Sequence, residues 1–107
     1  MEPRFSRHAI QRWAERVSKG SMETARWELQ SAYYRAVPVP KRYAERLAGV
    51  NTDCPSVKFL MTMEALLVIK GSAVVTVLPW GINQYMEVLV HLVMGAWTED
   101  VVAARAA

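Results

Sequence analysis

The chain has 107 residues, of which 52% are hydrophobic and 21% charged, and its formal net charge is +3 at pH 7. This composition predicts a single folded domain, residues 1–107, and excludes a largely disordered chain. Cys54 is the only cysteine, which excludes an intrachain disulfide. Together with the lack of a signal-like apolar run at the start, this predicts a reducing, cytoplasmic setting.

The positive charge is concentrated in the first half of the sequence. Residues 1–50 contain ten Lys or Arg and five Glu, a net +5, whereas residues 51–107 contain three Lys or Arg and five Asp or Glu, a net −2. Such a distribution favours a polyanion or an acidic protein surface as the partner of the basic half. No apolar run reaches the length of about 20 residues that a membrane-spanning helix needs, so no membrane association is expected.

Residues 5–17 predict the short helix around which the chain is organised. Ser6 is placed to cap its first turn, and Gly20 is placed to end it. At 3.6 residues per turn, one side is expected to pack and carries Ile10, Trp13 and Val17. The opposite side carries His8, Arg12, Glu15 and Lys19, with Arg16 at its edge.

A second helix is predicted after Ser21, which can cap it. Its apolar stripe consists of Met22, Ala25, Leu29, Ala32, Tyr33 and Ala36. Trp27 and Tyr34 lie off this stripe. Either another element covers them, which we expect because large apolar side chains usually pack, or they form an exposed aromatic patch beside Arg26 and Arg35.

The Val37–Pro40 segment stops the second helix, because proline lacks an amide donor and favours extended geometry in the residue before it. A third short helix is predicted for Lys41–Ala48, ending at Gly49. Residues 42–47 echo residues 12–17 position by position. Shared helix composition is the simpler reading of this echo. A true duplication would present two Arg-x-x-Glu-Arg faces suited to phosphate or acidic groups.

Turn-forming residues at 51–56 mark a change from helices to strands. Three strands are predicted from there on, at Val57–Met63, Leu66–Lys70 and Ala73–Leu78. The last two are separated by Gly71-Ser72, which suits a two-residue hairpin turn. This antiparallel β-ribbon spans residues 57–79.

The segment 83–97 fits two patterns. A helical stripe through Met86, Leu89, Val90, Val93 and Trp97 is favoured over an alternating strand through Val88, Val90 and Leu92. The apolar part at 86–97 would either close the core or form the seam of a homodimer, with His91 as a core or interface histidine. Thr98 is placed to cap a further short helix.

The predicted fold is therefore α+β. Two or three N-terminal helices within residues 6–49 pack on a small antiparallel sheet, and an apolar C-terminal helical segment follows at 83–106.

The opening motif Ser-Arg-His-Ala-x-x-Arg-x-x-x-Arg is formed by Ser6, Arg7, His8, Ala9, Arg12 and Arg16, with Glu15 inside it. Together with the strand hairpin over Leu67–Pro79, this motif resembles the small RelE/ParE-type toxins of bacteria and phages, within the barnase, colicin and RelE ribonuclease-like fold. The chain departs from that pattern in its third-helix segment and in its apolar tail after Gly81. The resemblance implies a ribonuclease that needs no metal or other cofactor, RNA as the substrate and an antitoxin as a partner. The ParE type instead acts by binding a topoisomerase.

The candidate catalytic residues are His8, Arg12, Glu15 and Arg16. A histidine can transfer protons near neutral pH, and arginines bind phosphate oxygens through a planar fork. Glu15 is either a second acid or base or the ion-pair partner of Arg12. Further candidate contacts to nucleic acid or a partner are Arg7, Lys19, Arg42 and Arg46. A solvated helix face would carry the same residue types, so this pattern permits the chemistry without requiring it.

Two distant histidines with no cysteine near them make no metal-binding pattern, so no metal site is expected. A second class of function also fits the sequence: a non-catalytic inhibitor or adaptor of phage type that binds a host defence or nucleic-acid-handling complex. The small size, the basic half and the Trp, Tyr and Arg content favour it, because these residue types are common at interface hot spots.

Overall fold

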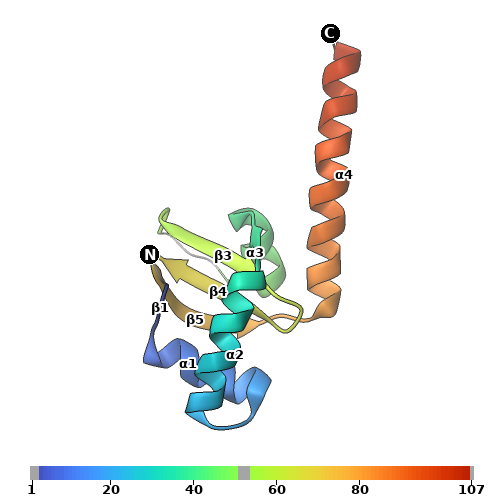
Figure 1. Cartoon of the computed structure of the whole chain (residues 1–107). Helices are drawn as coiled ribbons and strands as arrows, with labels where there is room; N and C mark the ends of the chain where they lie inside the picture. The colour runs from blue at the N-terminus through green and yellow to red at the C-terminus, as the bar shows by residue number, and fades with distance from the viewer. Residues whose placement is uncertain (1–2, 51–53, 107) are drawn as a thin grey trace.

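The computed structural model describes residues 3–50 and 54–106, with side chains described as far as Met94. Helices pack on both faces of one five-stranded sheet (Figure 1). In chain order the elements are β1 (Arg4–Phe5), α1 (Arg7–Trp13), the π-helical turn η1 (Ala14–Ser18), α2 (Met22–Arg35), β2 (Val37–Val39), α3 (Lys41–Ala48), β3 (Val57–Met61), β4 (Ala65–Lys70), β5 (Ala73–Pro79) and α4 (Ile82–Ala106).

The strands lie in the order β1-β5-β4-β3-β2. The predicted ribbon β3-β4-β5 is confirmed and antiparallel, but β1 runs parallel to β5, so the sheet is mixed and larger than expected. The prediction omitted both edge strands because they are only two and three residues long. Pro38 is tolerated in β2 because an edge strand does not need every amide donor for the ladder.

Two clusters of buried side chains lie on the two faces of the sheet. Helices α1 and α2 cover the first, which contains Ala9, Trp13, Ala14, Ala25, Leu29, Ala32, Ala65, Leu67, Ile69, Val74 and Val77. Helices α3 and α4 cover the second, which contains Val39, Ala44, Phe59, Met61, Leu66, Val68, Trp80 and Val88. Strand β4 contributes to both clusters and is buried from Ala65 to Ile69, as expected for a central strand covered on both sides.

The first helix follows its prediction at the start and departs from it at the end. Ser6 caps α1, and Trp13 is buried with an exposed fraction of 1%. The helix then widens into η1, where the Lys19 amide donates to the Ala14 carbonyl at 2.6 Å, five residues back. Lys19 ends the turn in the left-handed region with φ 53°. The prediction that Gly20 terminates the helix is therefore wrong by one residue.

The second helix is capped by Ser21 as predicted and buries Ala25, Leu29 and Ala32. The expectation that its off-stripe aromatic residues are covered is wrong, since Trp27 is 70% exposed and Tyr34 is 63% exposed. The reason is geometric: α2 lays one narrow stripe of mainly small side chains on the sheet, and α3 and α4 belong to the opposite face. Met22, which was placed on the packing stripe, is also exposed.

The third helix spans its predicted residues and ends at Gly49, which has φ 69°. The echo between residues 12–17 and 42–47 does not extend to the backbone, because the first copy runs into η1 and the second is α-helical throughout. The β4–β5 hairpin turn is confirmed, with Gly71 at φ 64°. The predicted turn at 51–56 lies partly outside the described residues, at 51–53.

Helix α4 confirms the helical alternative for 83–97 and continues without a break to Ala106, so the predicted cap at Thr98 is wrong. Its first part packs on the second cluster through Val88, supported by Leu89 and Leu92. His91 is exposed, so of the two places expected for it the core is wrong, and an interface stays a prediction. No helix in the described part of the chain is both long and apolar enough to cross a membrane.

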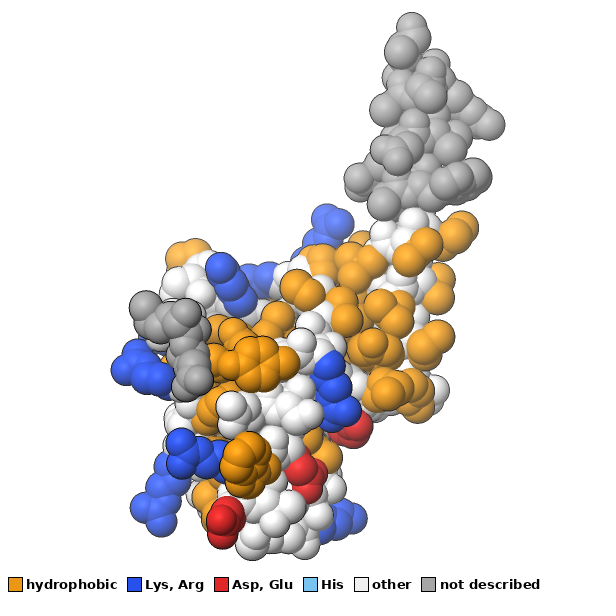
Figure 2. All heavy atoms as spheres, viewed as in Figure 1, with side chains coloured by type: hydrophobic (Ala, Val, Ile, Leu, Met, Phe, Trp, Pro, Cys, Tyr) orange, Lys and Arg blue, Asp and Glu red, His pale blue; other side chains and the backbone are white. Residues whose placement is uncertain are grey.

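The outer side of α4 carries an apolar strip formed by Met86, Val90, Val93 and Met94. Figure 2 shows hydrophobic side chains gathered over the described part of this helix, and Figure 1 shows the helix extending beyond the body of the molecule. The Trp97 side chain, expected on the same stripe, lies outside the described side chains. A homodimer seam at 86–97 stays a prediction.

Candidate functional site

The start of α1 is fixed to the sheet by Ser6. Its hydroxyl oxygen accepts a hydrogen bond from the Ala9 amide at 3.0 Å and donates one to the Val75 carbonyl at 2.9 Å. Val75 has no partner on β4, because Val68 pairs with Thr76 and Ile69 with Val74 around a β-bulge. A bulge leaves a backbone group outside the ladder, and the Ser6 hydroxyl satisfies it.

The outward face of α1 carries the predicted catalytic groups. His8 is exposed, and the Arg12 side chain is 40% exposed. The Arg12 guanidinium donates to Glu15 at 2.9 Å, and the Gln11 amide donates to the other Glu15 oxygen at 3.2 Å. Of the two roles left open for Glu15, the structure therefore shows the ion pair with Arg12.

The remaining basic candidates lie in two places. Arg7, Arg16 and Lys19 are exposed on α1, on η1 and directly after it. The widened turn interrupts the regular four-residue spacing that was expected to align Arg16 with Arg12. Arg42 and Arg46 are exposed on α3, which packs on the other face of the sheet, so the structure does not bring them together with His8.

Two hollows in the described surface are lined by residues other than the predicted catalytic ones. One is formed by Arg35, Thr62, Met63, Glu64 and Tyr85, and another by Glu23, Arg26, Trp27 and Gln30. His8 is exposed on α1 and lines neither of these two hollows. Within the described residues, no three His, Cys, Asp or Glu side chains lie close enough together to hold a metal ion.

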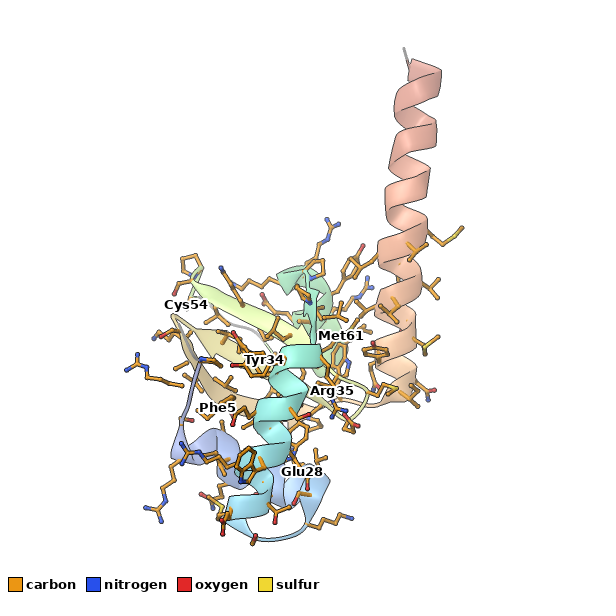
Figure 3. All side chains as sticks on the ribbon, in the orientation of Figure 1. Phe5, Glu28, Tyr34, Arg35, Cys54 and Met61 are labelled. Atoms are coloured by element: carbon orange, nitrogen blue, oxygen red, sulfur yellow. The ribbon has the colours of Figure 1, made fainter. Side chains whose placement is uncertain are left out.

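The exposed aromatic residues of α2 form a feature that the sequence prediction placed in the interior. Tyr34 packs edge-on against Tyr33, with 5.5 Å between ring centroids, and Arg35 reaches Glu64 at 3.9 Å. Figure 3 shows Tyr34 and Arg35 at the same end of α2. Their exposure could not be read from the pattern, because it depends on which elements cover the helix.

A second feature missed by the sequence prediction joins α3 to α4. The Tyr43 and His91 rings are stacked, and the guanidinium groups of Arg42 and Arg46 lie over the Tyr43 ring. The sequence predicts Arg42 and Arg46 as contacts and His91 as a core or interface residue, but it does not single out Tyr43. No local sequence signal connects positions so far apart in the chain.

The fold defines the class of this protein: an α+β domain in which two N-terminal helices cover one face of a sheet built around a strand hairpin. Residues 5–81 match the family model described as "Putative RelE superfamily toxin domain". The chain therefore belongs to the RelE superfamily of toxin domains, and the resemblance seen in the opening motif and the hairpin is confirmed. No curated protein and no solved structure is significantly similar to it. The matched part runs from β1 to just before α4.

Proposed function

We propose that this chain acts on RNA as a metal-independent ribonuclease toxin domain, with the outer face of α1 and η1 contacting the scissile phosphate. Membership of the RelE superfamily over residues 5–81 carries this proposal, since toxins of that superfamily are typically ribonucleases. The exposed His8 and Arg16 and the partly exposed Arg12 all lie within the matched part. The anchor from Ser6 to β5 gives this surface a rigid base.

These residues supply the groups needed for cleavage of RNA by its own 2′-hydroxyl. The 2′-oxygen forms a bond to the adjacent phosphorus, the bond from phosphorus to the 5′-oxygen breaks, and a 2′,3′-cyclic phosphate remains. In this proposal the His8 imidazole accepts the proton of the 2′-hydroxyl, and the departing 5′-oxygen takes a proton from solvent. Arg12 and Arg16 bind the phosphate oxygens as negative charge builds up, and Glu15 holds Arg12 in position.

The test is incubation of the purified chain with RNA in the presence of EDTA. The wild type is expected to leave 2′,3′-cyclic phosphate ends and to spare DNA of the same sequence, which lacks the attacking hydroxyl. His8→Ala is expected to slow cleavage by about 10²–10⁴-fold. Lys58→Ala, which removes an exposed cation from β3, serves as the charge control and should cleave like the wild type. Absence of cleavage by the wild type, or equal cleavage by His8→Ala, overturns the catalytic proposal.

A second candidate function is binding of a protein partner, either an antitoxin or, for a non-catalytic inhibitor or adaptor, a host complex. The exposed Trp27 and Tyr34, next to Arg26 and Arg35 respectively, favour it, because tryptophan, tyrosine and arginine dominate interface hot spots. Trp27→Ala should then weaken copurification of the partner while RNA cleavage persists. A complex that survives His8→Ala in a chain without RNA cleavage would favour the adaptor over the ribonuclease.

A further inference from the structure

The contact between α3 and α4 brings together side chains whose chemistry suits nucleic acid. The rings of Tyr43 and His91 lie 5.7 Å apart between centroids, with an interplanar angle of 19°, and so are stacked. The guanidinium carbon of Arg42 lies 5.0 Å from the Tyr43 ring centroid and that of Arg46 lies 5.5 Å from it. We call these four residues the seam cluster.

Each cationic group of the seam cluster is held near the ring yet remains accessible. Attraction between a guanidinium and an aromatic face stabilises such an arrangement. Arg42 and Arg46 are exposed residues, and the His91 side chain is 48% exposed. The stack therefore restricts the directions of these side chains without removing them from solvent.

Two carboxylates lie near the seam cluster, and the described ion pairs join them to His91 and to Lys41. Glu87, one turn before His91 on α4, places a carboxylate oxygen 3.9 Å from the His91 Nε2 atom. On α3 the nearest described ion pair joins Lys41 to Glu45, also at 3.9 Å. The two arginines are permanently charged, so the cluster presents a local positive potential that attracts an anion.

The position of the seam cluster separates it from the surface proposed for cleavage. Its α3 residues and His91 belong to the helices that cover the second cluster of buried side chains, whereas α1 covers the first. The family match ends at residue 81, before α4, so His91 lies outside the matched part. The two shorter dimensions of the molecule are 27 Å and 26 Å. A moderately long RNA can therefore reach from the surface of α1 to the seam cluster.

We propose that the seam cluster is a second RNA-binding site, which contacts a part of the RNA remote from the cleaved phosphate; this inference rests on the proposed function. Arg42 and Arg46 bind backbone phosphates through their planar forks, which match phosphate geometry better than a point charge does. The exposed side of the His91 ring offers a base a surface to stack on, and aromatic rings beside arginines are the usual platform for single-stranded RNA. The carboxylates of an acidic protein surface would pair with the arginines but would not stack on the His91 ring, so RNA matches the cluster better.

The length of the RNA provides the test. Stacked nucleotides advance about 3.4 Å each and fully extended ones about twice as far, so an RNA of about 20 nucleotides reaches roughly 68 Å even when stacked, whereas one of about 3 nucleotides reaches only roughly 20 Å when extended. The long RNA can contact both sites and the short one cannot. The Arg42→Gln/Arg46→Gln double variant is expected to raise KM for the long RNA by roughly tenfold and to leave kcat unchanged. His91→Ala should raise the same KM by a smaller factor, and neither variant should change cleavage of the short RNA.

Lys58→Gln removes an exposed cation from β3, outside every surface proposed for binding, and serves as the control for charge loss. Thermal unfolding of each variant is the check that α3 and α4 remain packed. If the wild type neither cleaves nor binds RNA, the proposed function itself fails. If the wild type cleaves RNA but the seam variants leave KM for the long RNA unchanged, or change both lengths equally, the second site alone is overturned. If the seam variants lose a copurifying protein but keep the RNA affinity of the wild type, the cluster binds a protein partner and the inference is overturned.

Discussion

Removal of the Ser6 hydroxyl tests how α1 is held to the sheet. Ser6 and Ser21 both cap helices, the first through the Ala9 amide at 3.0 Å and the second through the Thr24 amide at 3.1 Å. Only Ser6 also donates to a strand, at the unpaired carbonyl of the β5 bulge. Ser21 instead donates to the exposed Thr24 hydroxyl at 3.0 Å. The two serine-to-alanine variants therefore differ in that Ser6→Ala loses a part-buried, long-range hydrogen bond and Ser21→Ala an exposed, local one.

The expected magnitudes follow from these contacts. Ser21→Ala loses a cap, which costs about 1 kcal/mol of unfolding free energy. Ser6→Ala loses a similar cap and a partly buried hydrogen bond of about 1 kcal/mol, so its cost is about 2 kcal/mol. A shift of about 4–8 °C in Tm per kcal/mol makes this difference measurable in a domain of this size.

Urea unfolding followed by circular dichroism is the appropriate assay, with the free energy extrapolated linearly to water. Ser6→Thr, which retains a hydroxyl, should recover most of the stability lost in Ser6→Ala. Equal losses for Ser6→Ala and Ser21→Ala would refute the reasoning, because the bond to the bulge carbonyl would then contribute nothing. In a catalytically active protein, Ser6→Ala should also reduce RNA cleavage, since His8 lies on the turn that Ser6 anchors.

Three further predictions follow from burial and from one shifted pKa. Trp13→Ala should cost about 3–5 kcal/mol in urea unfolding, because it empties a fully buried site on α1; a loss below about 1 kcal/mol would contradict that packing. Val88→Ala should cost about 2 kcal/mol and Val90→Ala less than about 0.5 kcal/mol, since the two valines lie on the buried and exposed sides of α4; similar losses would refute the docking of this helix. Hydrogen bonds with Ser56 lower the pKa of the half-buried Cys54 thiol, so more thiolate is present at a given pH, and Cys54 should react with iodoacetamide at lower pH than free cysteine does; Ser56→Ala should move that profile to higher pH, and an unchanged profile would contradict the assignment.

Features with a local signal could be predicted from the sequence. The caps at Ser6 and Ser21, the stop at Gly49 and the turn at Gly71 all depend on residues within a few positions of one another, and the structure contains each of them. The apolar spacing around Trp13 also predicted correctly which side of the first helix is buried. In each case the physical cause is a single side chain or backbone angle that the local sequence specifies.

Features set by distant contacts could not be predicted. Strand β2 exists because Val37–Val39 pairs with Met61–Phe59, and three residues around a proline carry no strand signal of their own. Trp27 was expected to be covered because large apolar side chains usually pack, and His91 to lie in the core or an interface because its neighbours are apolar, yet their exposure depends on which elements lie over α2 and α4. The candidate site divides in the same way: periodicity placed His8 and Arg12 outward, whereas the stack of Tyr43 on His91 requires the tertiary fold.

Helix α4 links the stability of this fold to its surface chemistry. The residues matched by the family model end at 81, yet the second cluster of buried side chains includes Val88 and packs against Leu89 and Leu92. Without these side chains the sheet face at Leu66 would lose its cover, which costs about 25 cal/mol for each Å² of apolar surface returned to water. The same packing sets His91 of α4 against the half-buried Tyr43 of α3. Substitutions that loosen α4 from the sheet, such as Val88→Ala, should therefore also weaken binding of long RNA at the seam cluster, whereas Val90→Ala on the exposed side should leave it intact.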